Sequence, residues 1–215
     1  MIKINKSRKP GDISCDADYR KGVVYETLKR DCHEKCYICE DGTLTSIQVE
    51  HMDTNRELRH EWENLMFSCG HCNGIKNAYY VPIINCCRED PEDIFVFQTE
   101  AFPWSEPSIK RKDPTSSNIA YENTEKLLNH VYNGTPSAIR NDECESLRDR
   151  LFDELRALQN DMVAYREKHT TEERREELLS RIKWRISRQS PFSAFKREKI
   201  RSDPGLFRKF GGYLD

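Results

Sequence analysis

The 215-residue sequence lacks any long apolar run, and no stretch approaches the roughly 18 apolar residues needed to span a bilayer. Its opening residues, MIKINKSRKPGD, also lack the apolar segment of a secretory signal peptide. These absences predict a chain without membrane contact in a reducing, cytoplasmic compartment. The net charge is only −2, which argues against a histone-like protein that coats any polyanion but leaves a local basic patch possible.

The composition predicts a modest core. Hydrophobic residues make up 36% of the chain and charged residues 33%, which suits long solvated helices attached to a small globule. No internal repeat or low-complexity tract is present. We predict an α+β fold in two regions, a cysteine-rich domain over residues 1–115 and a mostly α-helical region over residues 116–215.

Periodicity and turn residues predict the local elements. In the first region these are a helix over 16–32, a strand over 44–51, a short helix from about 71 to 80 and a strand over 93–98. Residues 103–117, which hold three prolines, are predicted to be a connecting loop. In the second region we predict helices over 118–134, 135–169 and 170–189, and another that opens at Ser190–Pro191.

Four cysteines form two pairs at the spacing of a metal site, namely Cys36, Cys39, Cys69 and Cys72. In a reducing compartment such pairs bind metal more often than they form disulfides, and four thiolates saturate one tetrahedral Zn²⁺. We therefore predict a structural zinc site around residues 36–80. The remaining cysteines are predicted to be buried or incidental, and the nearby histidines not to be ligands: Cys15, Cys32, Cys86, Cys87 and Cys144, and His33, His60 and His71.

An acidic–histidine pair, Glu50–His51, lies between the two cysteine pairs. The sequence ENL follows at residues 63–65, and SCGHCNGIK carries Asn73 directly after the last cysteine. This order over about residues 36–80 resembles the HNH endonucleases, whose ββα-metal core carries a catalytic histidine on its first strand. The chain departs from the common pattern by having Glu50 where Asp is frequent and Asn73 where His is frequent.

The resemblance implies a metal-dependent hydrolysis of phosphodiester bonds. His51 would be the general base, since imidazole titrates near neutral pH. Glu50 and Asn73 would hold a catalytic Mg²⁺ or Mn²⁺, and Asn64 would orient the His51 imidazole. Lys76 could contact a phosphate, although a surface role is equally open.

More of the chain, including MIKINK, CYICE and SPFSAF, resembles the HNH nuclease subunits (the PtuB family) of Septu-type anti-phage systems, some of whose relatives accompany retrons. This resemblance implies an effector role in antiviral defence with an ABC-type ATPase (PtuA-like) as partner. In retron-linked forms a reverse transcriptase and its RNA–DNA product would join. DNA is the favoured substrate, and RNA, for example tRNA, is the alternative.

A basic segment spans residues 181–201, where eight basic residues stand against Glu198 alone and three aromatic residues are interleaved. Such a segment suits a nucleic-acid backbone or an acidic partner, although charge runs are often only solvated faces. The candidate contact residues are Arg181, Arg185, Arg188, Lys196 and Arg197. A different class of function also stays open, in which the chain is a non-catalytic zinc module whose helices bind a protein or nucleic acid.

Overall fold

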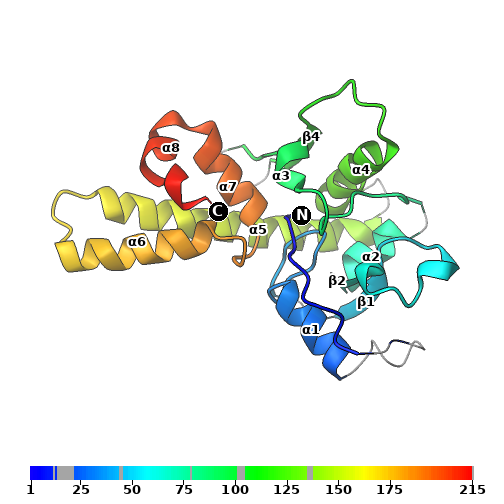
Figure 1. The fold of residues 1–215 in the computed structure, drawn as a ribbon. Coiled ribbons are helices and arrows are strands. Elements are labelled where there is room, and N and C mark those ends of the chain that lie inside the picture. Colours follow the sequence, from blue (N-terminus) through cyan, green and yellow to red (C-terminus); the bar gives the residue numbers. More distant parts are fainter. Residues whose placement is uncertain are drawn as a thin grey trace.

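The computed structural model describes residues 1–11, 13, 22–43, 46–77, 79–100, 105–134 and 138–214, and the side chains of 138–141 are not described. Helices dominate and two small antiparallel sheets accompany them, so the predicted α+β class is confirmed (Figure 1). No described helix has the length and apolar character of a membrane span. Several predicted features lie outside the described residues: Cys15, the start of the helix over 16–32, residues 44–45 of the strand over 44–51, and the start of the helix over 135–169.

A β-hairpin followed by a short helix forms much of the cysteine frame, which is the segment from Cys36 to Cys72. Strand β1 (Ile47–His51) pairs antiparallel with β2 (Leu65–Cys69), so that His51 lies opposite Leu65. Helix α2 (Gly70–Lys76) begins directly after β2, and the Cys69 sulfur accepts a hydrogen bond from the Cys72 amide at this start. Helix α1 (Val23–Asp31) packs on β2. The predicted strand and short helix are therefore found close to their expected positions.

A second hairpin follows the short helix α3 (Pro91–Ile94). It consists of β3 (Phe95–Gln98) and β4 (Ser108–Arg111). The prediction of a connecting loop over 103–117 is wrong for β4. This strand is stabilised by its β3 partner and by the Asn129 side chain, which accepts from the Ile109 amide and donates to the Ile109 carbonyl.

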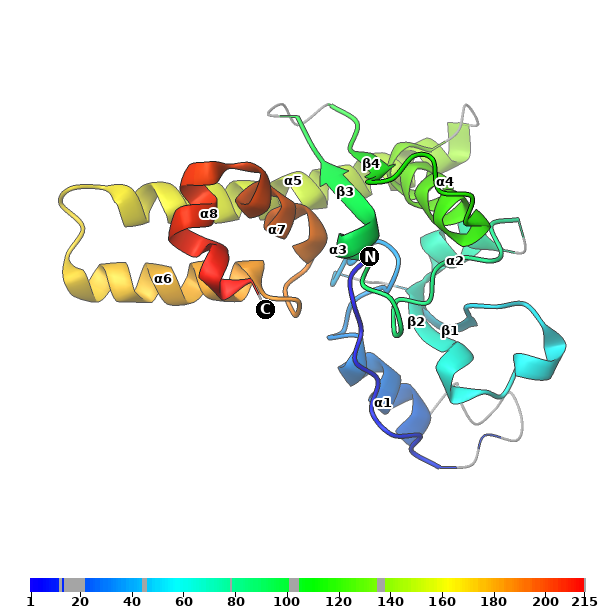
Figure 2. The ribbon, with the colours of Figure 1, turned by 45° about the horizontal axis from the view of Figure 1, so that its top comes forward.

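Five helices form most of the second half of the chain. They are α4 (Ile119–Asn133), α5 (Ala138–Arg166), α6 (Glu172–Ile186), α7 (Ser193–Ser202) and α8 (Pro204–Phe210). Thr171 caps α6 by accepting from the Arg174 amide. Helix α7 begins three residues after the predicted Ser190 opening, and α8 was not predicted. Both views show α5 and α6 as an antiparallel pair that extends away from the sheets (Figures 1 and 2).

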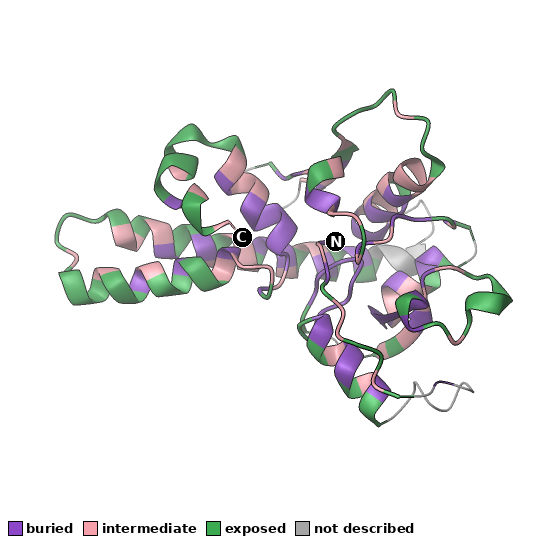
Figure 3. Cartoon of the chain, viewed as in Figure 1, coloured by how far each residue is buried: buried purple, intermediate pink, exposed green. Residues whose placement is uncertain are grey.

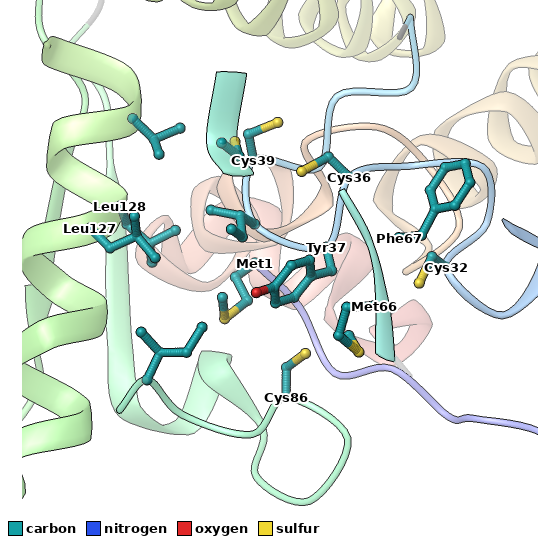
Figure 4. Close-up of a cluster of buried hydrophobic side chains, with 14 of the residues drawn as sticks. Met1, Cys32, Cys36, Tyr37, Cys39, Met66, Phe67, Cys86, Leu127 and Leu128 are labelled. Atoms are coloured by element: carbon teal, nitrogen blue, oxygen red, sulfur yellow. The ribbon is translucent and has the colours of Figure 1, made fainter. Parts of the chain in front are cut away.

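Two hydrophobic cores hold these elements together. The larger one includes the cysteine frame, β2, much of α4, Leu147 and Leu151 of α5, and Phe195 of α7. Figure 4 shows Tyr37 of the first cysteine pair within this core, near Met66 and Cys86. The smaller core joins α5, α6, α7 and α8, and the far ends of α5 and α6 are largely exposed (Figure 3). The predicted division at residues 115–116 thus falls inside the larger core, not between the two.

Candidate active site

The four predicted cysteine ligands come together in the structure. Cys36 and Cys39 lie in the turn after α1, Cys69 ends β2, and Cys72 lies in the first turn of α2. All four are buried, and their sulfur atoms lie within 4.8 Å of one another. Among the described residues this is the one group of three or more metal-ligating side chains of this kind.

The spacing of the sulfur atoms fits a tetrahedral metal ion. Zinc–sulfur bonds of about 2.3 Å place neighbouring sulfurs about 3.8 Å apart. The Cys39 and Cys69 sulfurs are 3.9 Å apart. Contacts with the other three thiols hold the pKa of Cys36 well below its ordinary value, although burial opposes this shift. Thus one thiolate is favoured before any cation adds its charge, and the cluster can hold a single structural metal such as zinc.

The cysteine frame is tied to the hairpin and to the helices. The Tyr37 amide donates to the Phe67 carbonyl of β2 at 3.0 Å, and the Tyr37 hydroxyl donates to the Glu50 carboxylate of β1. On the other side, the Tyr132 hydroxyl of α4 donates to the Cys39 carbonyl at 2.6 Å. Sequence reasoning missed Tyr37, whose position between two metal ligands was the available signal. A metal at the cysteines therefore fixes a residue that touches the acidic–histidine pair.

His51 lies at the end of β1, at the edge of a cavity of about 270 Å³. Its Nε2 atom is 2.9 Å from the backbone carbonyl oxygen of Arg59, in the loop between the two strands. A carbonyl only accepts hydrogen bonds, so Nε2 carries the proton in this contact, and in the neutral ring the lone pair lies on Nδ1. Strand and loop together thus select one tautomer of the imidazole.

Asn64 holds that loop. Its Oδ1 atom accepts from the Asp53 amide at 2.7 Å, and its Nδ2 atom donates to the carbonyls of Asp53 and Leu58. The prediction that Asn64 orients the His51 ring directly needs correction, since both amide hydrogens are used by loop backbone. Asn64 instead contacts His51 only indirectly, because it holds the loop whose Arg59 carbonyl contacts His51.

Glu50 is almost fully buried, with 4% of its surface exposed, and it lies on the face of β1 that meets α2. Its carboxylate accepts from Tyr37 and lies 3.7 Å from the Lys76 ammonium. Burial raises the pKa of Glu50 to about 7, although Lys76 and Tyr37 both oppose this shift. An acid with this pKa gains strongly from a nearby cation, which is compatible with the predicted ligand role.

Lys76 does not lie on the surface, since only 1% of it is exposed. Its ammonium donates to the His51 carbonyl at 2.8 Å and pairs with Glu50. The surface role is therefore wrong, while the phosphate contact stays a prediction, since Lys76 lines the His51 cavity. Lys76 instead links α2 to the end of β1, because the turn of α2 that carries it faces the strand.

Asn73 lies one helical turn before Asn77 on α2 and lines the same cavity as Glu50 and His51. Its Nδ2 atom donates to the Gln48 side chain on β1. Its Oδ1 atom is an acceptor, which can take a hydrogen bond or bind a cation. Gln48 was not predicted from the sequence, although its position two residues before Glu50 places both on one strand face. The structure thus gathers Glu50, His51 and Asn73 around one cavity.

His71 lies inside the second cysteine pair but does not face it. Its two ring nitrogens lie 2.8 Å from a Glu143 carboxylate oxygen and 2.9 Å from the Val131 carbonyl oxygen. These contacts to α5 and α4 agree with the prediction that His71 is not a ligand. They also attach the second cysteine pair to the helical half.

The five basic residues predicted to contact nucleic acid or a partner are all paired with acidic side chains. Arg181 and Arg185 pair with Asp161, Arg188 with Asp90, Lys196 with Glu154, and Arg197 with Glu92. Lys196 and Arg197 are fully buried, so the predicted surface contact is wrong for these two. Arg181 stays exposed, and Arg185 and Arg188 are partly buried. The segment mainly joins α6 and α7 to α3 and α5.

We expect Arg197→Ala to lower the free energy of unfolding by about 3–5 kcal/mol, because the substitution breaks a buried ion pair. The Arg197 Nε atom donates to both Glu92 carboxylate oxygens, at 2.8 and 3.0 Å, inside the protein. Urea unfolding followed by circular dichroism measures the change. Arg208→Ala on the exposed face of α8 is the control and should stay within about 0.5 kcal/mol of wild type. Equal unfolding midpoints for the two variants would contradict the assigned role of the pair.

Comparisons of the chain with family models, curated proteins and solved structures returned no match.

Proposed function

We propose that the chain is a metal-dependent endonuclease of the HNH type, with His51 as general base. The observation that carries the proposal is the cavity shared by His51, Glu50 and Asn73, beside a four-cysteine cluster that fits a structural zinc ion. The order of hairpin and helix, with the histidine ending the first strand, supports the same reading. A binding module with zinc alone has no need for this cavity.

The chain's own residues would supply the general base, the contacts that orient it and the ligands of the catalytic metal ion. The Nδ1 atom of His51 would take a proton from the attacking water, while Nε2–H stays on the Arg59 carbonyl and stabilises the imidazolium that forms. Lys76 fixes the end of the strand through the His51 carbonyl. Glu50 and Asn73 would hold Mg²⁺ or Mn²⁺, which when bound contacts the scissile phosphate and relieves charge on the leaving 3′ oxygen.

We propose duplex DNA as the substrate and a role in anti-phage defence beside an ABC-type ATPase. The support for both is the resemblance of the sequence to Septu-type nuclease subunits. RNA is the alternative substrate, since attack by water makes no use of the sugar 2′-hydroxyl. A retron-type assembly with a reverse transcriptase and its RNA–DNA product is the corresponding alternative context.

The test is cleavage by the chain alone and by the chain co-purified with the products of its neighbouring genes. Supercoiled plasmid, linear duplex DNA and total cellular RNA are incubated with Mg²⁺, with Mn²⁺ or without added divalent ion. Zinc content is measured in parallel by mass spectrometry. We expect plasmid cleavage that requires Mg²⁺ or Mn²⁺.

The outcomes separate the proposals. Cleavage of RNA alone would replace DNA as the substrate and favour the retron-type context. If an intact complex with zinc bound cleaves neither DNA nor RNA, the proposed nuclease activity is wrong. That result would favour the zinc-dependent binding module.

A further inference from the structure

The carboxylate of Glu50 is held by contacts on both of its oxygen atoms. The Tyr37 hydroxyl donates to Oε1, and the Lys76 ammonium lies 3.7 Å from Oε2. A glutamate side chain has three rotatable bonds, so ordering its tip costs conformational entropy unless a partner fixes it in advance. These contacts therefore set how the carboxylate lies beside the cavity that Glu50 lines.

Tyr37 is held through its ring and through its backbone. Only 2% of the residue is exposed, and it belongs to the larger hydrophobic core. Its amide donates to the Phe67 carbonyl of β2 at 3.0 Å. Phe67 lies opposite Val49 in the hairpin, and the neighbouring pair of the register is Met66 with Glu50. The backbone of Tyr37 is thus attached to the hairpin one residue pair away from the carboxylate that its side chain contacts.

The first cysteine pair surrounds Tyr37, which lies directly after Cys36 and two residues before Cys39. A metal ion held by these thiols would fix the backbone on both sides of the tyrosine. The same turn is anchored to α4, because the Tyr132 hydroxyl donates to the Cys39 carbonyl at 2.6 Å. Two buried tyrosines thus contact the turn in different ways. The Tyr132 hydroxyl bonds to its backbone, whereas the Tyr37 hydroxyl reaches out of it to Glu50.

We propose that Tyr37 is a positioning residue for the catalytic metal ion, because it holds the Glu50 carboxylate in the orientation that binds Mg²⁺ or Mn²⁺. This inference rests on the proposed nuclease function, in which Glu50 is a ligand. A carboxylate oxygen has more than one acceptor site, so a hydrogen bond from Tyr37 leaves room for a cation. Partners that hydrogen-bond to a ligating carboxylate orient it. One side chain thereby connects the cysteine cluster to the candidate catalytic metal site.

Four substitutions separate positioning from packing. Tyr37→Phe removes the hydroxyl and keeps the buried ring. Tyr132→Phe is the matched control, because it makes the same change at a buried tyrosine that contacts the same turn through the Cys39 carbonyl. Glu50→Gln removes the charged ligand itself. Glu50→Asp keeps Tyr37 and a carboxylate but shortens the side chain by one methylene, so it tests the same hydrogen bond from its other partner.

Mn²⁺ binding to the zinc-loaded protein is measured by electron paramagnetic resonance, without nucleic acid. The half-saturating Mn²⁺ concentration for plasmid cleavage is the second readout. We expect Tyr37→Phe to weaken Mn²⁺ binding about 10–100-fold and to raise the half-saturating concentration by a similar factor. Glu50→Asp should also weaken binding, Glu50→Gln should abolish it, and Tyr132→Phe should bind Mn²⁺ as wild type does. Zinc content and melting temperature are measured for every variant, since a loss of packing alone lowers the melting temperature and leaves the Mn²⁺ affinity unchanged.

The outcomes separate the positioning role from the nuclease activity. If Tyr37→Phe binds Mn²⁺ like Tyr132→Phe while Glu50→Gln does not bind it, Tyr37 only packs the core and the proposed nuclease stands. If Tyr37→Phe loses its zinc, Glu50→Asp decides, and Mn²⁺ binding as in wild type would overturn the positioning role. Mn²⁺ binding by Glu50→Gln as tight as in wild type would show that Glu50 is not a ligand, and the role of Tyr37 would fail with it.

The wild-type protein gives the remaining decisions. If it cleaves with Mn²⁺ but binds the ion only together with nucleic acid, the half-saturating concentrations of the variants decide in place of the binding titration. If it binds Mn²⁺ through Glu50 but cleaves nothing, alone or in its complex, the nuclease fails while the binding titration still tests Tyr37. If it neither binds Mn²⁺ nor cleaves, both proposals are wrong.

Discussion

Cys72→Ser is expected to abolish stoichiometric zinc binding and to unfold the part of the chain that shares the larger hydrophobic core. Cys72 is fully buried, and its sulfur belongs to the four-cysteine cluster at the start of α2. Structural zinc sites supply roughly 10–16 kcal/mol of binding free energy in small peptides. The whole net stability of a domain is only about 5–15 kcal/mol. Losing one thiolate therefore removes a contribution as large as the stability itself.

The measurements are zinc per chain by mass spectrometry and thermal unfolding by circular dichroism. Wild type should carry one zinc per chain, and a strong chelator should shift its unfolding to lower temperature. Cys87→Ser is the matched control, because it makes the same chemical change at a half-buried cysteine outside the cluster. The structural zinc site would be ruled out if wild type purifies without metal and Cys72→Ser has the same melting temperature as Cys87→Ser.

His51→Ala is expected to lower the rate of nucleic-acid cleavage by about 10²–10⁴-fold, the usual contribution of a positioned general base. The fold should be kept, because His51 is only partly buried at the end of β1 and its carbonyl contact with Lys76 belongs to the backbone. Zinc content and melting temperature should therefore match wild type. Gel-based cleavage of plasmid with Mg²⁺ provides the rate.

Two further variants sharpen the assignment. His51→Gln keeps an amide donor for the Arg59 carbonyl but has no base, so it should be as inactive as His51→Ala. His169→Ala, at an exposed position between α5 and α6, makes the same substitution far from the cavity and should leave the rate unchanged. Activity in His51→Gln close to wild type would show that His51 orients the loop and takes no proton.

The cysteine frame could be predicted from the sequence because its signals are local. The x2 spacing of each pair, the alternation before His51 and the start of α2 at the second pair all lie within a few residues of the feature they specify. The resemblance to the HNH endonucleases implied that Glu50, His51 and Asn73 share a site, and these three residues line one cavity. Their catalytic roles stay predictions.

The features that could not be predicted from the sequence depend on contacts between distant segments. Strand β4 is held by hydrogen bonds with β3 and with the Asn129 side chain, which no pattern within residues 103–117 reveals. The segment 181–201 looks basic because its acidic partners lie elsewhere: Glu92, for example, is more than a hundred residues before Arg197. Lys76 looks like a surface residue until the packing of α2 on β1 turns it inward.

Helix α5 belongs to both hydrophobic cores, through Leu147 and Leu151 in the larger one and Leu158 in the smaller. With 29 residues it is about 44 Å long. A tilt of about 5° at Leu151 would displace Arg166 by about 2 Å, from the rise per residue. Helix α5 packs on α4, and α4 packs on α2, so two helix contacts connect α5 to the helix that carries Asn73 and Lys76.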